Sequence, residues 1–312
     1  MTGPTIAAGG AKGSIEGRSR SGRLRDLLVN PWGQARFLWV VGVGYVLWSL
    51  VPIALAVLFS FNSSRSISSW QGFSLRWYIA DPNESVWHDL ALRQSVIQSL
   101  KLSALTMIFA TLLGLGFALA LDRWRGRGAG TTNSIMMFSF ITPELVLAVA
   151  LFLLFINLFK FVGLGTPAQL LGLITLALAY AVVIVRARLL SLGREYEEAA
   201  MDLGASPLQA IRRVLLPLLY PAIFGSAAII FAFTLDDFVM ASALSLDAST
   251  ETVAIKIYSA VRTSPTPAAN ALGTLMLTTS TTVIIVAIIV YRHFTRGERN
   301  QASAAQEITT RL

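Results

Sequence analysis

The chain has 312 residues, of which 54% are hydrophobic and only 13% are charged. Soluble domains carry about 25% charged residues, so this composition indicates a protein embedded in a lipid bilayer. Cysteine is absent and histidine occurs only as His88 and His293, which excludes disulfides and cysteine metal sites and argues against a histidine-rich metal site.

Residues 1–36 are rich in Gly, Ser and Arg and contain no apolar run. We expect them to form a disordered, basic N-terminal tail. The segment Ile15–Arg18 reads as a protease-cleavage tag, although a natural basic tail fits equally well. Because no cleavable signal peptide precedes the first apolar run, we expect that run to anchor the chain in the membrane.

Six apolar runs are long enough to cross a membrane, since a helix needs ~20 apolar residues to cross a hydrocarbon layer about 30 Å thick. The runs are Phe37–Phe61, Val96–Leu121, Ser134–Phe159, Ala168–Leu190, Leu218–Met240 and Ala271–Tyr291. The sequence therefore predicts an all-α, polytopic integral membrane protein with one six-helix domain over residues 37–291. Residues 292–312 follow as a C-terminal tail.

The basic residues predict how the six runs are oriented. If both termini and the loops after the second and fourth runs lie on one side, that side holds 18 of the 25 Lys and Arg residues, and the other side holds seven. Lys and Arg are enriched in cytoplasmic loops. We therefore expect both termini and the loop 191–217 to lie on the cytoplasmic side of the membrane.

Two segments on the opposite side have features of short helices. Residues 62–94 contain Ser74–Ile79, whose Trp and Tyr suit a helix that lies at the membrane interface. Residues 241–270 contain the apolar run Val253–Val261, which is too short to cross the bilayer. We expect this run to form a surface or re-entrant helix.

The loop 191–217 predicts a helix, a turn and a second helix. Strong helix formers occupy residues 195–200, and Gly204 then interrupts the pattern. Ser206 and Pro207 are the residue types that favour the N-cap and the first position of a new helix, and Pro217 predicts a bend back into the membrane. The apolar residues of the second helix fall on one face, at Leu208, Ile211 and Leu215.

The order Glu198-Ala199-Ala200, Gly204, Val214, Leu216-Pro217 resembles the coupling loop of importer-type ABC transporter permeases, with Val214 where that family usually has Ile. The resemblance implies that the helix pair binds a groove of a cytoplasmic ATPase and transmits its closure to the membrane helices. The residues assigned to this coupling are Glu198, Ala199, Ala200, Asp202, Gly204, Leu216 and Pro217. Considered without the resemblance, a hairpin that merely caps the bundle is an equal alternative.

The chain lacks the G-x-x-x-x-G-K-[ST] sequence of a phosphate-binding loop. We therefore expect it to be a non-catalytic subunit that binds no cofactor, with ATP and Mg²⁺ held by a separate ATPase subunit. The resemblance implies four further partners, namely a second homologous permease, two ATP-binding subunits and an extracytoplasmic solute-binding protein, besides membrane lipid. A homodimer of permeases stays open, and nothing indicates a nucleic acid.

Within this superfamily the resemblance is greatest to the second permease of spermidine/putrescine importers, and it covers most of residues 37–291. Importers of iron, sulfate, thiamine or opines share parts of the pattern and stay open as alternatives. The local sequences that carry the resemblance are Leu75–Tyr78, Thr142–Val146, Leu235–Val239, Lys256–Arg262, Pro267 and Asn270–Leu272.

Acidic residues inside the expected spans are candidates for a cation pathway, because a mid-helix charge costs about 3 kcal/mol on insertion scales. Glu144 lies within the third run, and Asp236 and Asp237 lie near the outer end of the fifth. We expect these acids at different depths, with at least one of the two aspartates directed away from any lumen because adjacent helical residues diverge by about 100°. A local polar network at Glu144 and an interfacial cap at the aspartates are the alternatives.

Tyr180 and Phe233 are candidates for cation–π contact with an alkylammonium group, or else ordinary packing residues. Gly114 and Gly116 predict close helix packing rather than a site. An ion-coupled secondary transporter is a less favoured reading, since such proteins are usually longer and carry inverted repeats. No nucleophile–base pair, metal cluster or redox motif supports an intramembrane enzyme or scaffold.

Overall fold

A computed structural model describes residues 36–66, 69–123, 126, 130–131, 134, 138, 141–263 and 266–309. The elements in chain order are α2 (Arg36–Ser60), the π-helical turn η1 (Arg76–Ala80), α3 (Leu90–Arg123), α5 (Glu144–Asn157), α6 (Thr166–Leu192), α7 (Glu195–Asp202), α8 (Pro207–Ala210), the π-helical turn η2 (Ile211–Leu215), α9 (Leu216–Leu235), α10 (Val239–Ala243), α11 (Val253–Thr263) and α12 (Pro267–Thr309). Apart from one bridge between Asn62 and Phe73, the described residues contain no β structure.

Among the described residues, five helices are long and apolar enough to cross a membrane: Leu38–Ser60, Leu90–Arg123, Thr166–Leu192, Pro207–Leu235 and Pro267–Arg292. They confirm the first, second, fourth, fifth and sixth expected spans. At the third expected span the structure has α5, which is only 14 residues long. Most of residues 124–140, and residues 1–35 of the expected tail 1–36, lie outside the described residues, so the described part of the chain does not complete the count of six.

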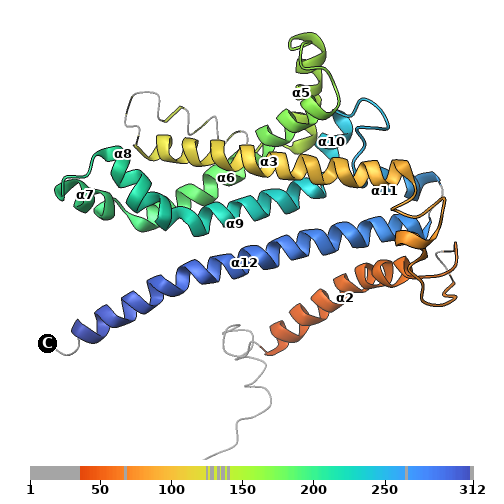
Figure 1. Cartoon of the computed structure of the whole chain (residues 1–312), viewed down its shortest axis with the longest axis horizontal. Helices are drawn as coiled ribbons and strands as arrows, with labels where there is room; N and C mark the ends of the chain where they lie inside the picture. Colours follow the sequence, from red (N-terminus) through yellow and green to blue (C-terminus); the bar gives the residue numbers. More distant parts are fainter. Residues whose placement is uncertain are drawn as a thin grey trace, which may run out of the picture. The chain divides into compact units, whose positions relative to one another are not determined.

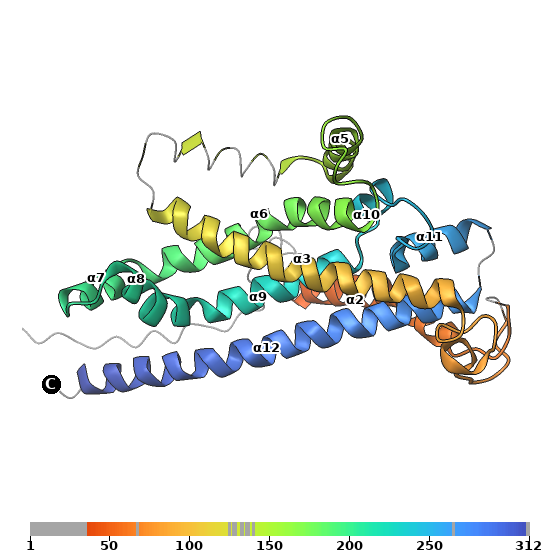
Figure 2. The same ribbon diagram turned by 45° about the horizontal axis from the view of Figure 1, so that its top comes forward.

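The chain divides after Leu55 into two units, and the second, from Ala56 onward, contains the bundle. Helices α3, α6 and α9 pack against one another, and α12 packs along α9 (Figures 1 and 2). Gly114 lies at the contact between α3 and α6, where an added Cβ would be 2.3 Å from the Ala181 Cβ. This confirms close packing at Gly114, whereas a Cβ at Gly116 would meet nothing within 4 Å.

The expectation of an interfacial helix at Ser74–Ile79 is wrong about the place of the Trp77 side chain. The segment forms η1, but the Trp77 ring is fully buried in a cluster that includes Phe231 of α9 and Leu272 of α12. Its indole N–H donates to the Asn62 carbonyl at 2.6 Å. A Trp whose N–H has an internal acceptor can bury its whole ring without a polar penalty, so Trp77 serves the core rather than the lipid interface.

Asp81 closes η1. Its Oδ1 accepts the backbone N–H of Asn83 at 3.0 Å, and its Oδ2 accepts Nε–H of Arg76 at 2.8 Å. The Asn83 amide, followed by the Arg76 guanidinium, lowers the pKa of Asp81 to about 2. The short helix expected at Val253–Val261 is confirmed as α11, and α12 continues past Tyr291 to Thr309, so most of the expected tail 292–312 is helical.

Candidate functional site

The loop 191–217, called the coupling loop below, has the predicted helix–turn–helix form. Helix α7 ends at Asp202, and Gly204 follows with φ +88°, a value that favours glycine. Ser206 caps the next helix, because its Oγ accepts the Gln209 N–H at 3.4 Å and its own N–H donates to Gln209 Oε1 at 2.9 Å. This reciprocal pair is a capping box, and Pro207 takes the first helical position as expected.

The bend expected at Pro217 does not interrupt the helix, which is continuous from Pro207 to Leu235. The π-helical turn η2 comes immediately before α9, and there the Leu216 N–H donates to the Ile211 carbonyl, five residues back. Proline donates no hydrogen bond and its ring crowds the carbonyl four residues earlier. A wider turn relieves that crowding, and α8 and α9 consequently run in different directions (Figure 1).

Most of the predicted coupling residues are exposed on α7 and the turn. Glu198, Ala199, Asp202 and Gly204 are exposed and Ala200 is half-buried. At the start of α9, Leu216 is half-buried and Pro217 is exposed.

Two exposed leucines complete this surface. Leu203 is 90% exposed in the turn and Leu208 is 73% exposed on α8. The expectation that Leu208 shares one apolar face with Ile211 and Leu215 is therefore wrong, since of these three residues only Ile211 and Leu215 pack against the bundle. Sequence analysis did not single out Leu203. Its position next to Gly204, in a turn that cannot bury it, is the signal that identifies it.

A group of four charged side chains attaches α7 to the end of α3. Arg123 donates Nη2–H to Glu197 Oε1 and pairs through Nη1 with Asp122 Oδ2 at 2.7 Å. Arg194 donates Nη2–H to the Asp122 carbonyl at 2.8 Å. Glu197 is buried, unlike its neighbour Glu198. Sequence analysis missed this group, because its members come from segments more than 70 positions apart, and Arg123 and Glu197 are separated by 74 positions.

The candidate pathway acids lie together, contrary to the expected difference in depth. Glu144, Asp236 and Asp237 line one cavity of about 540 Å³. The reason is that α5 begins and α9 ends beside this cavity. Helix α5 begins at Glu144, immediately after Pro143, so Glu144 lies in a first turn, where the helix dipole favours an acid. Helix α9 ends at Leu235, which places both aspartates in the connection to α10.

The two aspartates have different environments. Asp236 is exposed, whereas Asp237 is 6% exposed. Asp237 Oδ1 accepts the Ala241 N–H at 3.0 Å, while its Oδ2 is buried without a hydrogen-bond partner among the described residues, beside the Glu144 carboxyl. Both aspartates line the cavity, so the expected divergence is wrong because the backbone there is not helical.

The two aromatic candidates contact each other but have different surroundings in the structure. The Tyr180 and Phe233 rings contact each other with centroids 5.2 Å apart and planes inclined by 38°. Phe233 lines the cavity together with Phe238 and Ser280. Tyr180 packs beside the small cluster of Ala110, Ala177, Ala181 and Ile230. The structure therefore brings Phe233 to the cavity and places Tyr180 in the packing behind it.

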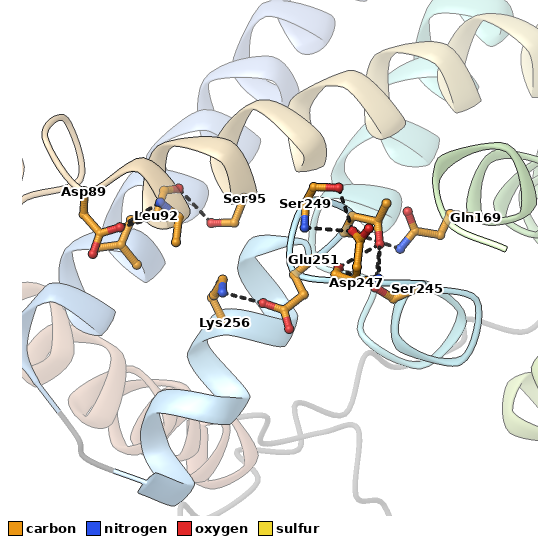
Figure 3. A network of polar contacts seen from close by, with 11 residues as sticks. Asp89, Leu92, Ser95, Gln169, Ser245, Asp247, Ser249, Glu251 and Lys256 are labelled. Atoms are coloured by element: carbon orange, nitrogen blue, oxygen red, sulfur yellow. Dashed lines mark hydrogen bonds and ion pairs between the residues drawn. The ribbon is translucent and has the colours of Figure 1, made fainter.

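A buried amide holds the segment that follows Asp237. Gln169 of α6 is fully buried and donates to the carbonyls of Ala241 at 2.8 Å and Thr250 at 2.9 Å. Gln98 of α3 donates to Gln169 Oε1 at 3.0 Å. Figure 3 shows Gln169 directed at the loop of Ser245, Asp247 and Ser249. Because Ala241 also donates to Asp237, this bond network fixes one wall of the acidic cavity to two long helices.

Within the described ranges, no group of three His, Cys, Asp or Glu side chains is arranged to hold a metal ion. The polar chemistry available in the cavity is therefore that of carboxyl groups and the Ser280 hydroxyl, next to the aromatic faces of Phe233 and Phe238. Such a set can attract an organic cation and shield it from lipid.

Comparisons with known proteins identify the family. Residues 110–300 match the model of the "Binding-protein-dependent transport system inner membrane component" family. The chain is 35% identical over 247 residues to the spermidine/putrescine transport system permease protein PotC of Escherichia coli strain K12, covering 79% of this chain and 90% of that protein. It is 34% identical over 256 residues to the putrescine transport system permease protein PotI of the same strain, covering 80% and 88%.

Among solved structures, the fold is similar to a chain of the bacterial alginate ABC transporter in complex with an alginate pentasaccharide-bound periplasmic protein. The TM-score is 0.61 with 17% identity, over 87% of this chain and 96% of that chain. At this identity the likeness concerns the fold. The chain therefore belongs to the family of inner membrane components of binding-protein-dependent transport systems and is a permease subunit of an ABC importer.

Proposed function

We propose that this permease subunit imports polyamines together with a second, homologous permease, and that the coupling loop is the contact surface for the ATPase. The observation that carries the proposal is the exposed face of α7 and its turn, where the side chains of Glu198, Asp202 and Leu203 are all exposed. A mixed acidic and apolar surface that is exposed in the single chain is typical of a site that a partner protein covers in the complex.

The orientation follows from the charges. Both termini and the coupling loop lie in the cytoplasm, in line with the placement of 18 of 25 basic residues on that side. Two ATP-binding subunits then bind ATP and Mg²⁺, because this chain has no phosphate-binding loop. The chain itself binds no cofactor and catalyses no reaction. Its role is to convert closure of the ATPase dimer into movement of the bundle.

The cargo enters from a solute-binding protein on the opposite face. The outer segments available for that contact are residues 62–94, which include η1, and residues 241–270, which include α11. The structurally similar alginate transporter is in complex with a periplasmic protein, which supports a partner of this kind. Figure 3 shows Lys256 and Glu251 paired in this region.

The acidic cavity supports a polyamine cargo. PotC and PotI are permeases of spermidine/putrescine and putrescine systems by name, and the cavity supplies the opposite charge. Two unit charges 4 Å apart attract by about 4 kcal/mol at an effective dielectric constant of 20. Glu144 and Asp237 bring carboxyl groups to the cavity that can pair with an ammonium group, and Phe233 offers a ring face for a cation–π contact. The cavity repels small anions such as sulfate.

Uptake of labelled spermidine into vesicles that contain the whole transporter tests the cargo. We expect Glu144→Gln and Asp237→Asn each to raise the KM for spermidine by at least about tenfold, since tenfold corresponds to only 1.4 kcal/mol of lost attraction. Ser280→Ala is the matched control, because Ser280 lines the same cavity without a charge. An unchanged KM in both amide variants refutes the electrostatic argument. Uptake without any ATPase subunit would instead favour an ion-coupled transporter.

A further inference from the structure

The two consecutive glutamates of α7 have opposite environments. Glu198 is exposed and available to a partner, whereas Glu197 is 8% exposed and pairs with Arg123, the last residue of α3. Arg123 also pairs with Asp122, and Asp122 lies 3.9 Å from Arg194. Positive and negative groups thus alternate along a chain of four whose formal charges cancel.

Three side chains of this charged group are shielded, whereas that of Arg194 is 39% exposed. The exposed fractions of the side chains are 10% for Glu197, 27% for Arg123 and 16% for Asp122. Ion pairs that are partly out of water are screened less by salt than surface pairs. Removing one partner of such a pair costs much more than removing an exposed pair, because a charge is left without compensation.

Glycine lies on each side of α7. Gly193 precedes it with φ +69° and Gly204 follows it with φ +88°. Backbone at these positions does little to fix the direction of an eight-residue helix. The orientation of α7 therefore depends on side-chain contacts, and the charged group connects it to α3 while other contacts connect it to α8 and η2.

Helix α3 carries this connection to the other end of the bundle. Its 34 residues correspond to a length of about 50 Å at a rise of 1.5 Å per residue. Near its start, Ser99 Oγ accepts the Val253 N–H at 2.9 Å, and Gln98 donates to Gln169. One helix thus contacts α7 at its end and, near its beginning, is connected through Gln169 to the segment that borders the acidic cavity.

We propose that Arg123 and Glu197 are positioning residues that lock α7 onto α3, so that a displacement of the exposed Glu198 face moves α3 as a rigid element. The inference rests on the proposed role of the coupling loop in binding the ATPase. Without the lock, movement of the ATPase rotates α7 about its flanking glycines, and ATP is hydrolysed without transport.

The absence of native cysteine allows two spin labels to be placed on the full-length chain. Ala120→Cys on α3 and Tyr196→Cys on α7 are both exposed sites. We expect a narrow distance distribution in the otherwise native chain, a broad one in Arg123→Glu and in Glu197→Arg, and a narrow one again when both charges are exchanged. Glu198→Arg is the matched control and leaves the distribution narrow. Arg123→Gln replaces Arg123→Glu if the latter does not fold.

The whole transporter supplies the second measurement, the number of ATP molecules hydrolysed per cargo molecule transported. We expect each single variant to raise this ratio by at least about tenfold. The effect on coupling is smaller than for a fully buried ion pair, because Arg123 is partly exposed. The charge exchange and Arg123→Lys restore the ratio. Native distances and ratios in the single variants overturn the inference, as does a charge exchange that restores neither. Failure of the native chain to co-purify with an ATPase contradicts the proposed function instead. The distance measurement then still shows whether Arg123 and Glu197 hold α7 against α3.

Discussion

Replacing Gln169 with leucine removes three hydrogen bonds from a fully buried site while keeping a side chain of similar size. Two donated bonds, to the carbonyls of Ala241 and Thr250, and one accepted from Gln98 are lost. Interhelical bonds in membrane proteins average about 0.6 kcal/mol, so three give about 2 kcal/mol. If both carbonyls instead stay buried without partners, each costs about 1–3 kcal/mol, and the free energy of unfolding falls by up to about 6 kcal/mol.

Thermal unfolding of the purified chain in detergent measures this loss, with Thr175→Val as the matched control. Thr175 lies on the same helix, is exposed, and bonds only to its own helix, at the Leu171 carbonyl, so its replacement changes stability by less than about 0.5 kcal/mol. We also expect Gln169→Leu to raise the KM for spermidine, because Ala241 positions Asp237. Equal melting temperatures of Gln169→Leu and Thr175→Val refute the reasoning.

Two further predictions concern packing and pH. Gly114→Ala destabilises the chain by about 1–3 kcal/mol because its Cβ meets Ala181, whereas Gly116→Ala, which meets nothing, does not; equal unfolding midpoints of the two variants contradict the close contact. Asp81 has a pKa of about 2 in place of 3.8, so its contribution to stability is present above pH 3.8 and is lost as the pH falls toward 2. The difference in melting temperature between the native chain and Asp81→Asn should shrink over that range, and a difference that is constant with pH contradicts the role of the charge.

Local patterns were sufficient for most of the long helices and for the form of the coupling loop. Apolar runs predicted five of the long helices, and Ser206-Pro207 predicted the start of α8, because capping depends on neighbouring residues alone. The end of α9 was predicted five residues too late. The apolar residues after Asp237 continue the run to Met240, so hydrophobicity alone does not show that the helix ends at Leu235.

Contacts between distant segments were beyond the reach of these patterns. The meeting of Glu144 with Asp237 depends on how α5 packs against α10, and that of Arg123 with Glu197 depends on where α3 ends beside α7. Trp77 illustrates the same limit, since its neighbours predict an interfacial residue while helices α9 and α12 bury it. In each case the deciding partner lies far away in the sequence.

We propose that the coupling loop couples ATP hydrolysis to transport through its exposed acidic face. The most direct measurement is ATP-dependent spermidine uptake by vesicles that contain the whole transporter with Glu198→Arg, with ATPase subunit content determined in the same preparation. We predict that the variant inserts normally but that uptake is abolished, because the substitution reverses an exposed charge on the surface proposed to contact the ATPase. Uptake at the native rate in this variant would contradict the account.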